Sequence, residues 1–260
     1  MDILPEYDII DVTNTIDDRP EKYALFKNND LISSYIRSYG AFQPDIMRIC
    51  LKFMTDKTQN VLDIGANIGS FTIPVAKNIT GTVFSFEVQR HIFMQLCTNC
   101  FLNRLANVYP IHGFITNKEN LNKYSEVSIV NYYNSENTGA FSINEEHIKI
   151  TSNITYLPPT IEDAFDKIQT IHIDDLNIQN IGFIKIDVEG AELDVLKGMQ
   201  NTIKQNDFPP LLFECSIHEA YTDIREKLFQ FIQDSGYGSI YPIENIADNF
   251  VAFKKGFVIF

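Results

Sequence analysis

Cysteine is scarce in this sequence of 260 residues, and there is no long apolar run. Four cysteines are too few for a disulfide framework in a chain of this size, which favours free thiols and a reducing compartment. No run of about 18 apolar residues is available to span a membrane. The N-terminus, MDILPEYDII, carries acids and a proline where a signal peptide needs a basic start. These absences predict a cytoplasmic protein without a membrane partner.

Basic residues are also few. The chain has 21 lysines and arginines against 34 aspartates and glutamates, for a formal net charge of −13, and no lysine- or arginine-rich run. A protein with this charge repels phosphate backbones unless a local basic patch intervenes. We therefore expect no nucleic-acid partner and favour a small molecule or a glycan as the substrate.

The order of apolar and polar residues predicts one α/β domain. Residues 1–39 lack sustained periodicity and are expected to be irregular, whereas residues 43–54 have the spacing of an amphipathic helix. Strands at 60–64, 82–86 and 108–112 then alternate with helices at 70–77 and 90–103, which is a βαβαβ series.

The second half of the chain resumes this alternation after a polar interruption. Residues 117–170 favour a hairpin-like insertion, because short alternating stretches lie among asparagine, serine and threonine. Strands are expected at 183–186 and 211–215, helices at 191–199 and 220–235, and a closing antiparallel pair at 238–242 and 249–253. The resulting division is an N-terminal extension with a lead-in helix, 1–57, and a main domain, 58–260.

A glycine turn follows the first strand of the main domain. The sequence runs Asn60-Val-Leu-Asp63-Ile-Gly65-Ala-Asn67-Ile-Gly69. Glycines here let the backbone approach a ligand closely, and Asp63 could accept from the amino group of an amino-acid moiety. The alternative is a tight strand-to-helix turn without a ligand.

Glu87 follows the next strand, about 20 residues after the turn. In nucleotide-binding βαβ units an acid at this place accepts hydrogen bonds from both ribose hydroxyls. An isolated glutamate after a strand is more often a solvated charge, but its separation from the turn favours the ligand role.

A third block, Ile184-Lys-Ile-Asp187-Val-Glu189-Gly-Ala-Glu192, places acids at the end of another strand. Ligands of open α/β sheets bind at the carboxyl ends of the strands. The alternative is structural, since acids at the start of a helix interact favourably with the helix dipole.

Together, the motifs VLDIGANIG, FSFE and IKIDVEGAELDVLKG resemble the FkbM family of S-adenosylmethionine-dependent methyltransferases, as does NCFLNRLANV between them. The resemblance covers about residues 58–255. It implies a Rossmann-like class I methyltransferase fold, with a mostly parallel seven-stranded sheet, helices on both faces and a closing antiparallel strand. It also implies O-methylation of a hydroxyl on a sugar, glycan or other small molecule, with 117–170 on the substrate side. The implied cofactor residues are Asp63, Gly65, Ala66, Asn67, Gly69, Phe71, Glu87, Val88, His112, Gly113 and Asp187.

The sequence departs from the family at two places. Val88-Gln89 stand where a proline and a small polar residue often follow the FE pair. His112-Gly113 stand where many methyltransferases have an acid for the adenine amino group. These differences leave the adenine contacts open.

Methylation of a hydroxyl needs alignment and a group that takes one proton. The candidates for this base at strand ends are Asp187, Glu189, Glu214 and His218, of which we favour Glu189 and His218. Asp174, Asp187 and Glu214 could instead bind a divalent ion, but nothing in their spacing demands one. We expect no metal. Cys97 and Cys100 form a single CxxC pair without the second pair of a zinc site.

Three other functions remain open. A nucleotide-dependent oxidoreductase on a similar core is disfavoured by the lack of GxGxxG. A cofactor-binding module without turnover is compatible with intact motifs. A nucleic-acid methyltransferase is disfavoured by the acidic charge.

Overall fold

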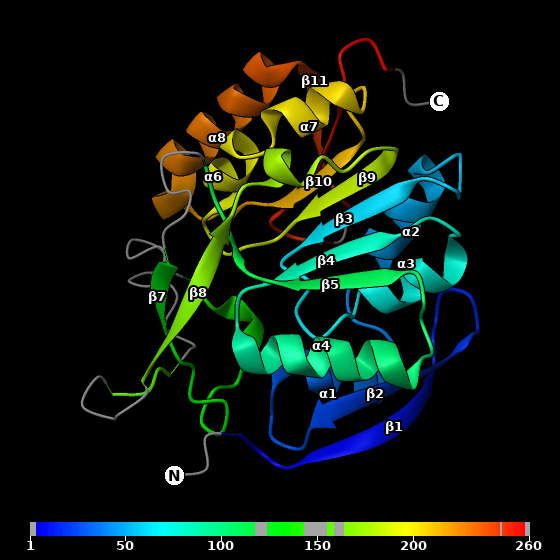
Figure 1. The fold of residues 1–260 in the computed structure, drawn as a ribbon, viewed down its shortest axis with the longest axis vertical. Helices are drawn as coiled ribbons and strands as arrows, with labels where there is room; N and C mark the ends of the chain where they lie inside the picture. The colour runs from blue at the N-terminus through cyan, green and yellow to red at the C-terminus, as the bar shows by residue number, and fades with distance from the viewer. Residues whose placement is uncertain (1–3, 118–123, 143–154, 159–163, 245, 258–260) are drawn as a thin grey trace.

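A central seven-stranded sheet organises the computed structural model, which describes residues 4–117, 124–142, 155–158, 164–244 and 246–257. Its strand order is β11-β12-β10-β9-β3-β4-β5 (Figure 1). Five neighbouring strands are parallel, and β12 and β11 add an antiparallel edge. The expected fold class is thus confirmed. The strands are β3 (Asn60–Ile64), β4 (Val83–Glu87), β5 (Val108–His112), β9 (Ile181–Ile186), β10 (Leu211–Glu214), β11 (Tyr237–Pro242) and β12 (Asn249–Lys254).

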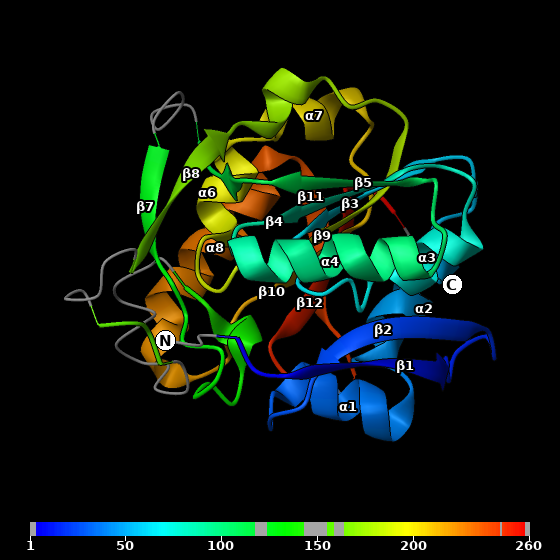
Figure 2. The ribbon, with the colours of Figure 1, turned by 60° about the horizontal axis from the view of Figure 1, so that its bottom comes forward.

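Helices cover both faces of this sheet (Figures 1 and 2). Alternate side chains of a strand point to opposite faces: Leu62 and Ile64 pack in the core beneath α6, α7 and α8, and Val61 packs toward α2 and α3. Both faces of the parallel strands are therefore buried, which accounts for their continuous apolar runs. The helices are α2 (Pro44–Phe53), α3 (Thr72–Asn78), α4 (Arg90–Leu102), α6 (Glu192–Lys197), α7 (Gln200–Gln205) and α8 (Thr222–Ser235).

The order of the strands reverses between β3 and β9. From β3 the chain continues outward through β4 and β5, and after the insertion it returns to β9 on the other side of β3. Such a switch point leaves a crevice at the carboxyl ends of the strands. The three motifs of the sequence end on this crevice.

The N-terminal segment is regular, so the expectation of an irregular extension was wrong. β1 (Tyr7–Thr13) and β2 (Pro20–Phe26) form an antiparallel hairpin, and α1 (Leu31–Tyr39) follows. Figure 2 shows this unit beneath α4. Asn99 of α4 accepts a hydrogen bond from the Ala24 backbone N–H at 2.7 Å. The hairpin is fixed by tertiary contacts, which local periodicity does not reveal.

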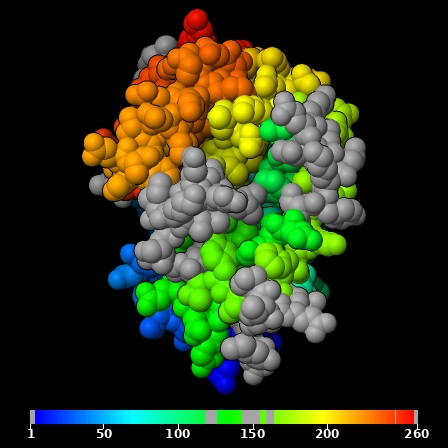
Figure 3. All heavy atoms as spheres, turned by 90° about the vertical axis from the view of Figure 1, so that its left-hand side faces the viewer, coloured from blue at the N-terminus to red at the C-terminus, as the bar shows by residue number. Residues whose placement is uncertain are grey.

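The insertion was expected to be hairpin-like; its antiparallel pairing joins strands at its two ends rather than neighbouring stretches. β7 (Tyr124–Ser128) pairs antiparallel with β8 (Phe165–Ile171), and β6 (Phe114–Ile115) pairs parallel with β8. A short 3-10 helix, η2 (Thr138–Ala140), lies between β7 and β8, and two more, η3 (Ile173–Leu176) and η4 (Glu219–Tyr221), lie outside the insertion. Residues 118–123, 143–154 and 159–163 of the expected insertion lie outside the described residues. In Figure 3 the insertion, in green, lies between the orange and yellow C-terminal helices and the blue N-terminal segment.

Candidate active site

A cavity lies at the switch point, over the carboxyl ends of β3, β4, β9 and β10. It is lined by the glycine turn, by the residues after β4 and β5, by the acids after β9 and β10, and by parts of α1, α2 and η2. The lining residues include Leu31, Ile32, Phe42, Gly65, Ala66, Asn67, Phe71, Glu87, Val88, Gln89, Gly113, Asn137, Gly139, Phe141, Lys185, Asp187, Glu189 and Glu214.

The glycine turn brings two parts of the chain unusually close. Gly65 has φ +84°, and a Cβ built on it would lie 1.7 Å from the carbonyl oxygen of Asp187. The N–H groups of Gly65 and Ala66 both donate to the carbonyl of Phe86. The turn is therefore bonded to the neighbouring strand, and its close approach places the β3 and β9 motifs side by side.

Asp63 lies behind the turn and is fully buried. Its carboxylate accepts from the Thr72 hydroxyl at 2.5 Å and from Lys185 Nζ at 3.3 Å. It is not among the residues lining the cavity. Direct contact between Asp63 and a ligand stays a prediction, while the geometry gives this carboxylate a role in holding the turn and β9 together.

Glu87 lines the cavity with a carboxylate that is almost fully buried. One oxygen accepts from the backbone N–H of Asn67 at 2.9 Å and the other from that of Gln89 at 2.8 Å. Burial raises the pKa of Glu87 to about 7 in spite of these hydrogen bonds. Glu87 is thus fixed in orientation, between the glycine turn and the start of α4.

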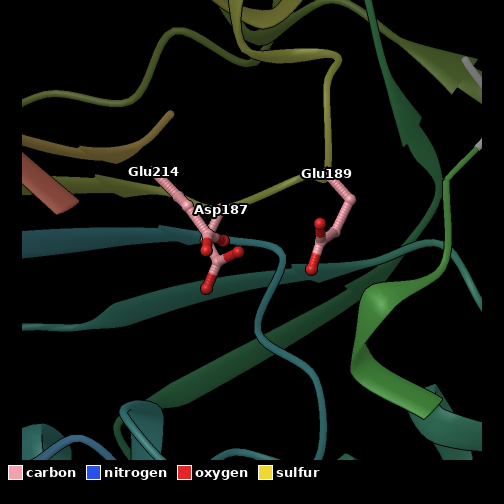
Figure 4. Close-up of side chains that lie close together, drawn as sticks. All are labelled: Asp187, Glu189 and Glu214. Atoms are coloured by element: carbon pink, nitrogen blue, oxygen red, sulfur yellow. The ribbon is translucent and has the colours of Figure 1, made fainter. Parts of the chain in front are cut away.

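Three carboxylates meet at the ends of β9 and β10. Oxygens of Asp187, Glu189 and Glu214 lie within 4.8 Å of one another (Figure 4). Burial and the neighbouring acids hold the pKa values of Glu189 and Glu214 well above the usual range. Burial acts in the same direction on Asp187, but Lys185, whose Nζ lies 3.2 Å from its carboxylate, lowers its pKa overall. The group therefore contains one carboxylate that stays ionised and two that readily take a proton.

Lys185 is the principal residue that sequence reasoning missed. Its side chain is buried, and its Nζ contacts Asp63, Asp187 and the carbonyl of Gly65. A lysine inside the otherwise apolar strand IGFIKI was the available signal, because a buried lysine requires compensating partners. The apolar N-terminal lining, with Leu31 and Ile32, was missed because residues 1–39 were expected to be irregular.

The remaining predicted residues divide into two groups. Ala66, Phe71, Val88 and Gly113 line the cavity together with the main motifs. Gly69 is not among the lining residues. Its φ is +92°, and a Cβ built on it would meet the side chains of Leu96 and Ile73.

Two predicted histidines lie outside this lining. The ring of His112 stacks on Phe93, and its Nε2 lies 3.1 Å from the Val88 carbonyl. His218 is exposed, and its Nδ1 accepts from the backbone N–H of Ala220 at the start of η4. The geometry therefore favours Glu189 over His218 as the base.

Asp174 is likewise remote from the acidic group, because its carboxylate accepts from Thr202 and Asn201 at the start of α7. The alternative ion site of Asp174, Asp187 and Glu214 is not assembled. Among the described residues, no helix has the length and apolar character needed to cross a membrane.

These features define a class of protein. A parallel sheet with an antiparallel edge, a GxNxG turn after β3 and an acid at the end of β4 form a class I methyltransferase fold. More particularly, the model of the methyltransferase FkbM domain matches residues 63–238, so the chain belongs to this family of methyltransferases. The resemblance found in the sequence is confirmed, and S-adenosylmethionine is the methyl donor that the family uses.

Individual relatives are more distant. The tRNA(Phe) (4-demethylwyosine(37)-C(7)) aminocarboxypropyltransferase of Methanocaldococcus jannaschii is 39% identical over 62 residues, which is 24% of this chain and 25% of that protein. The structure of methyltransferase FkbM from Methylobacillus flagellatus KT is 20% identical, with a TM-score of 0.46, over 76% of this chain and 44% of that one. M. jannaschii TYW2 in complex with AdoMet is 14% identical, with a TM-score of 0.45, over 95% and 84%. The chain thus spans a quarter of the curated relative.

Proposed function

We propose that this methyltransferase methylates a hydroxyl group on a sugar, a glycan or another uncharged small molecule. The observation that carries the proposal is the convergence of Glu87 and the three strand-end carboxylates on one cavity. One end of the cavity suits the cofactor, and the other holds groups that can receive a proton.

The cofactor end fits S-adenosylmethionine. Glu87 presents a buried, fixed carboxylate that can accept from two ribose hydroxyls. The turn at Gly65, which has no room for a side chain, lets the backbone approach the methionine moiety. Val88 and Gly113 line the cavity beside Glu87, and the adenine ring of the cofactor would lie against them. When bound, the cofactor supplies a methyl group on a positively charged sulfur.

The acceptor end provides a base. A hydroxyl that is methylated must lose its proton, and a carboxylate with a raised pKa is a better acceptor for that proton than an ordinary one. Glu189 meets this requirement because burial and its acidic neighbours raise its pKa. Asp187, paired with Lys185, stays ionised and is suited to orient the acceptor by hydrogen bonding.

The charge of the cavity favours an uncharged acceptor. Its ionisable lining residues, within the part of the chain that the structure describes, are four acids, Glu87, Asp187, Glu189 and Glu214, and one base, Lys185. The lysine is already paired with Asp63 and Asp187. Among the described lining residues no other basic side chain is available to hold a phosphate, so this argument favours sugars and polyols over the tRNA named for the curated relative.

The test is methyl transfer from labelled S-adenosylmethionine to a panel of neutral sugars, polyols, glycans, nucleosides and tRNA. Glu189→Gln should lower the transfer rate by about 10²–10⁴-fold, as expected for loss of a general base, with S-adenosylhomocysteine binding retained. Glu219→Gln, at an exposed acid of η4, is the matched control and should be unaffected.

Transfer only to tRNA, or full activity of Glu189→Gln, would overturn the acceptor and the base respectively. Cofactor binding without transfer to any member of the panel would favour a binding module without turnover.

A further inference from the structure

We propose that Gln89 is a positioning residue that links the cofactor carboxylate Glu87 to the segment covering the acceptor end, residues 137–142. This inference rests on the proposed function, because it takes Glu87 as the cofactor contact. Gln89 belongs to none of the sequence motifs and has no role in the proposed catalysis. Through Gln89, the acceptor side would depend on whether the cofactor is bound.

Besides the helix bond that its carbonyl accepts from the Phe93 N–H, Gln89 makes three hydrogen bonds. Its backbone N–H donates to Glu87 at 2.8 Å. Its side-chain Nε2 donates to the carbonyl of Thr138 at 3.0 Å, and its Oε1 accepts from the Tyr132 hydroxyl at 3.0 Å. Gln89, Tyr132 and Thr138 are all buried. Breaking one of these bonds would leave a buried polar group unpaired, so the arrangement is fixed strongly.

The segment that Gln89 holds covers the cavity. Asn137, Gly139 and Phe141 line it, and a Cβ on Gly139 would lie 3.3 Å from the Asn67 side chain. Farther along, the hydroxyl of Ser142 donates to the backbone carbonyl of Glu189 at 2.5 Å. The segment thus reaches from the glycine turn to the residue proposed as the base.

A second anchor holds the same segment from the N-terminal side. The buried carboxylate of Asp30 accepts from both the backbone N–H and the hydroxyl of Thr138, and its other oxygen caps α1 at Ser33. The backbone N–H of Leu31 donates to the Glu136 carbonyl at 2.8 Å. With Asp30 fixed on one side, Gln89 is the connection to the cofactor side.

These contacts form one continuous path. A cofactor held by Glu87 restricts that carboxylate, the Gln89 N–H bonded to it and, through the Gln89 amide, the Thr138 carbonyl. A bound cofactor has already ordered this path, so the acceptor does not have to order it again when it binds. The acceptor should therefore bind more tightly to the cofactor-bound protein. By thermodynamic linkage, a bound acceptor should strengthen cofactor binding by the same factor.

Hydrogen exchange tests the path without knowledge of the acceptor. S-adenosylhomocysteine is added to the full chain, and backbone exchange is followed over residues 64–69 and 137–142. In the wild type we expect slower exchange in both segments, on the order of tenfold over 137–142. Gln89→Met retains length and packing but cannot bond to Thr138 or Tyr132. Compared at a ligand concentration that saturates both proteins, it should keep the effect at 64–69 and lose the effect over 137–142.

Two controls separate positioning from general destabilisation. Gln230→Met replaces an exposed glutamine of α8 and should respond as the wild type does. Tyr132→Phe removes only the bond to Oε1 and should keep most of the effect, because the Thr138 bond is intact.

Equal slowing over 137–142 in Gln89→Met and wild type would overturn the role of Gln89. Slowing at 64–69 alone in the wild type would overturn the coupling while leaving the proposed function in place. Failure of the wild type to bind S-adenosylhomocysteine would overturn both.

Discussion

At Gly65 the space available decides which residue the chain can accept. The position has φ +84°, and its missing side chain would overlap the Asp187 carbonyl. Gly256 offers a matched comparison, since its φ is +89° and nothing lies within 4 Å of a Cβ built there. Both glycines share the conformational requirement, but only Gly65 has the steric one.

We therefore predict different losses for the two alanine variants. Gly256→Ala should cost about 1 kcal/mol of unfolding free energy, the cost of a left-handed conformation for alanine. Gly65→Ala should cost several kcal/mol more and should weaken S-adenosylhomocysteine binding, because β3 and β9 must separate. Urea denaturation and calorimetry measure the two effects. Equal losses at the two sites would contradict the close approach.

Glu87 should make cofactor binding depend on pH. Burial raises its pKa to about 7 in the free protein, and the ionised form is the one that accepts from two hydroxyls. Affinity for S-adenosylhomocysteine should therefore rise with pH, by about tenfold between pH 6 and pH 8. Glu87→Gln should bind more weakly and lose this dependence. A wild-type affinity that does not change over this range, measured by calorimetry, would argue against the carboxylate contact.

At the scale of elements, α4 connects the N-terminal hairpin to the glycine turn. Asn99 is fully buried; it accepts from the Ala24 N–H of β2 and donates to the Ile68 carbonyl at 2.9 Å. Gln95, one turn earlier, donates to the Ala24 carbonyl at 2.6 Å. The hairpin is thereby attached to the element that begins at the cavity.

Replacing Asn99 should loosen this attachment. Asn99→Ala leaves the Ala24 N–H and the Ile68 carbonyl without their partner, which costs about 1–3 kcal/mol per buried group. We expect a lower urea midpoint and faster proteolysis within β1 and β2. Thr98→Ala, at the exposed neighbouring position, is the control. A hairpin as resistant in Asn99→Ala as in Thr98→Ala would show that other contacts hold it.

At the scale of the whole molecule, buried acids link stability to pH. Burial raises the pKa of Glu192 from 4.5 to about 7, although backbone N–H groups of Val188 and Gly190 bond to it. A carboxyl whose pKa is raised on folding contributes stability that is complete below the unfolded pKa. That contribution is lost as pH rises through the folded pKa. The stability contribution of Glu192 is therefore lost between about pH 4.5 and pH 7.

Glu192→Gln should flatten the pH dependence of unfolding. The amide keeps an oxygen for the same N–H groups but does not titrate, so the variant should gain on the wild type as pH rises from 5 to 8. The gain is on the order of 3 kcal/mol, from about 1.4 kcal/mol for each unit of pKa difference. Urea titrations at several pH values measure it. Glu226→Gln, at an exposed acid of α8, should show no such gain.

The sequence alone determined the strands of a mostly parallel sheet and the three motifs at the strand ends. These features are local: apolar runs, the GxNxG turn and acids that directly follow strands are each read within a dozen residues. Parallel strands bring their carboxyl ends to one edge. The sequence pattern therefore predicts Glu87, Asp187, Glu189 and Glu214 at the same edge of the sheet.

The tertiary structure alone decided which of these groups face the cavity and what covers it. Asp63 is directed to Thr72 and Lys185, His218 remains at the surface, and Lys185 bridges two motifs 122 positions apart in sequence. Asn99 bonds to the N-terminal hairpin, and Asp30 and Gln89 bond to the segment 137–142 that covers the cavity. Such contacts join segments far apart in the chain, and each depends on the packing of the others. Periodicity and spacing therefore do not predict them.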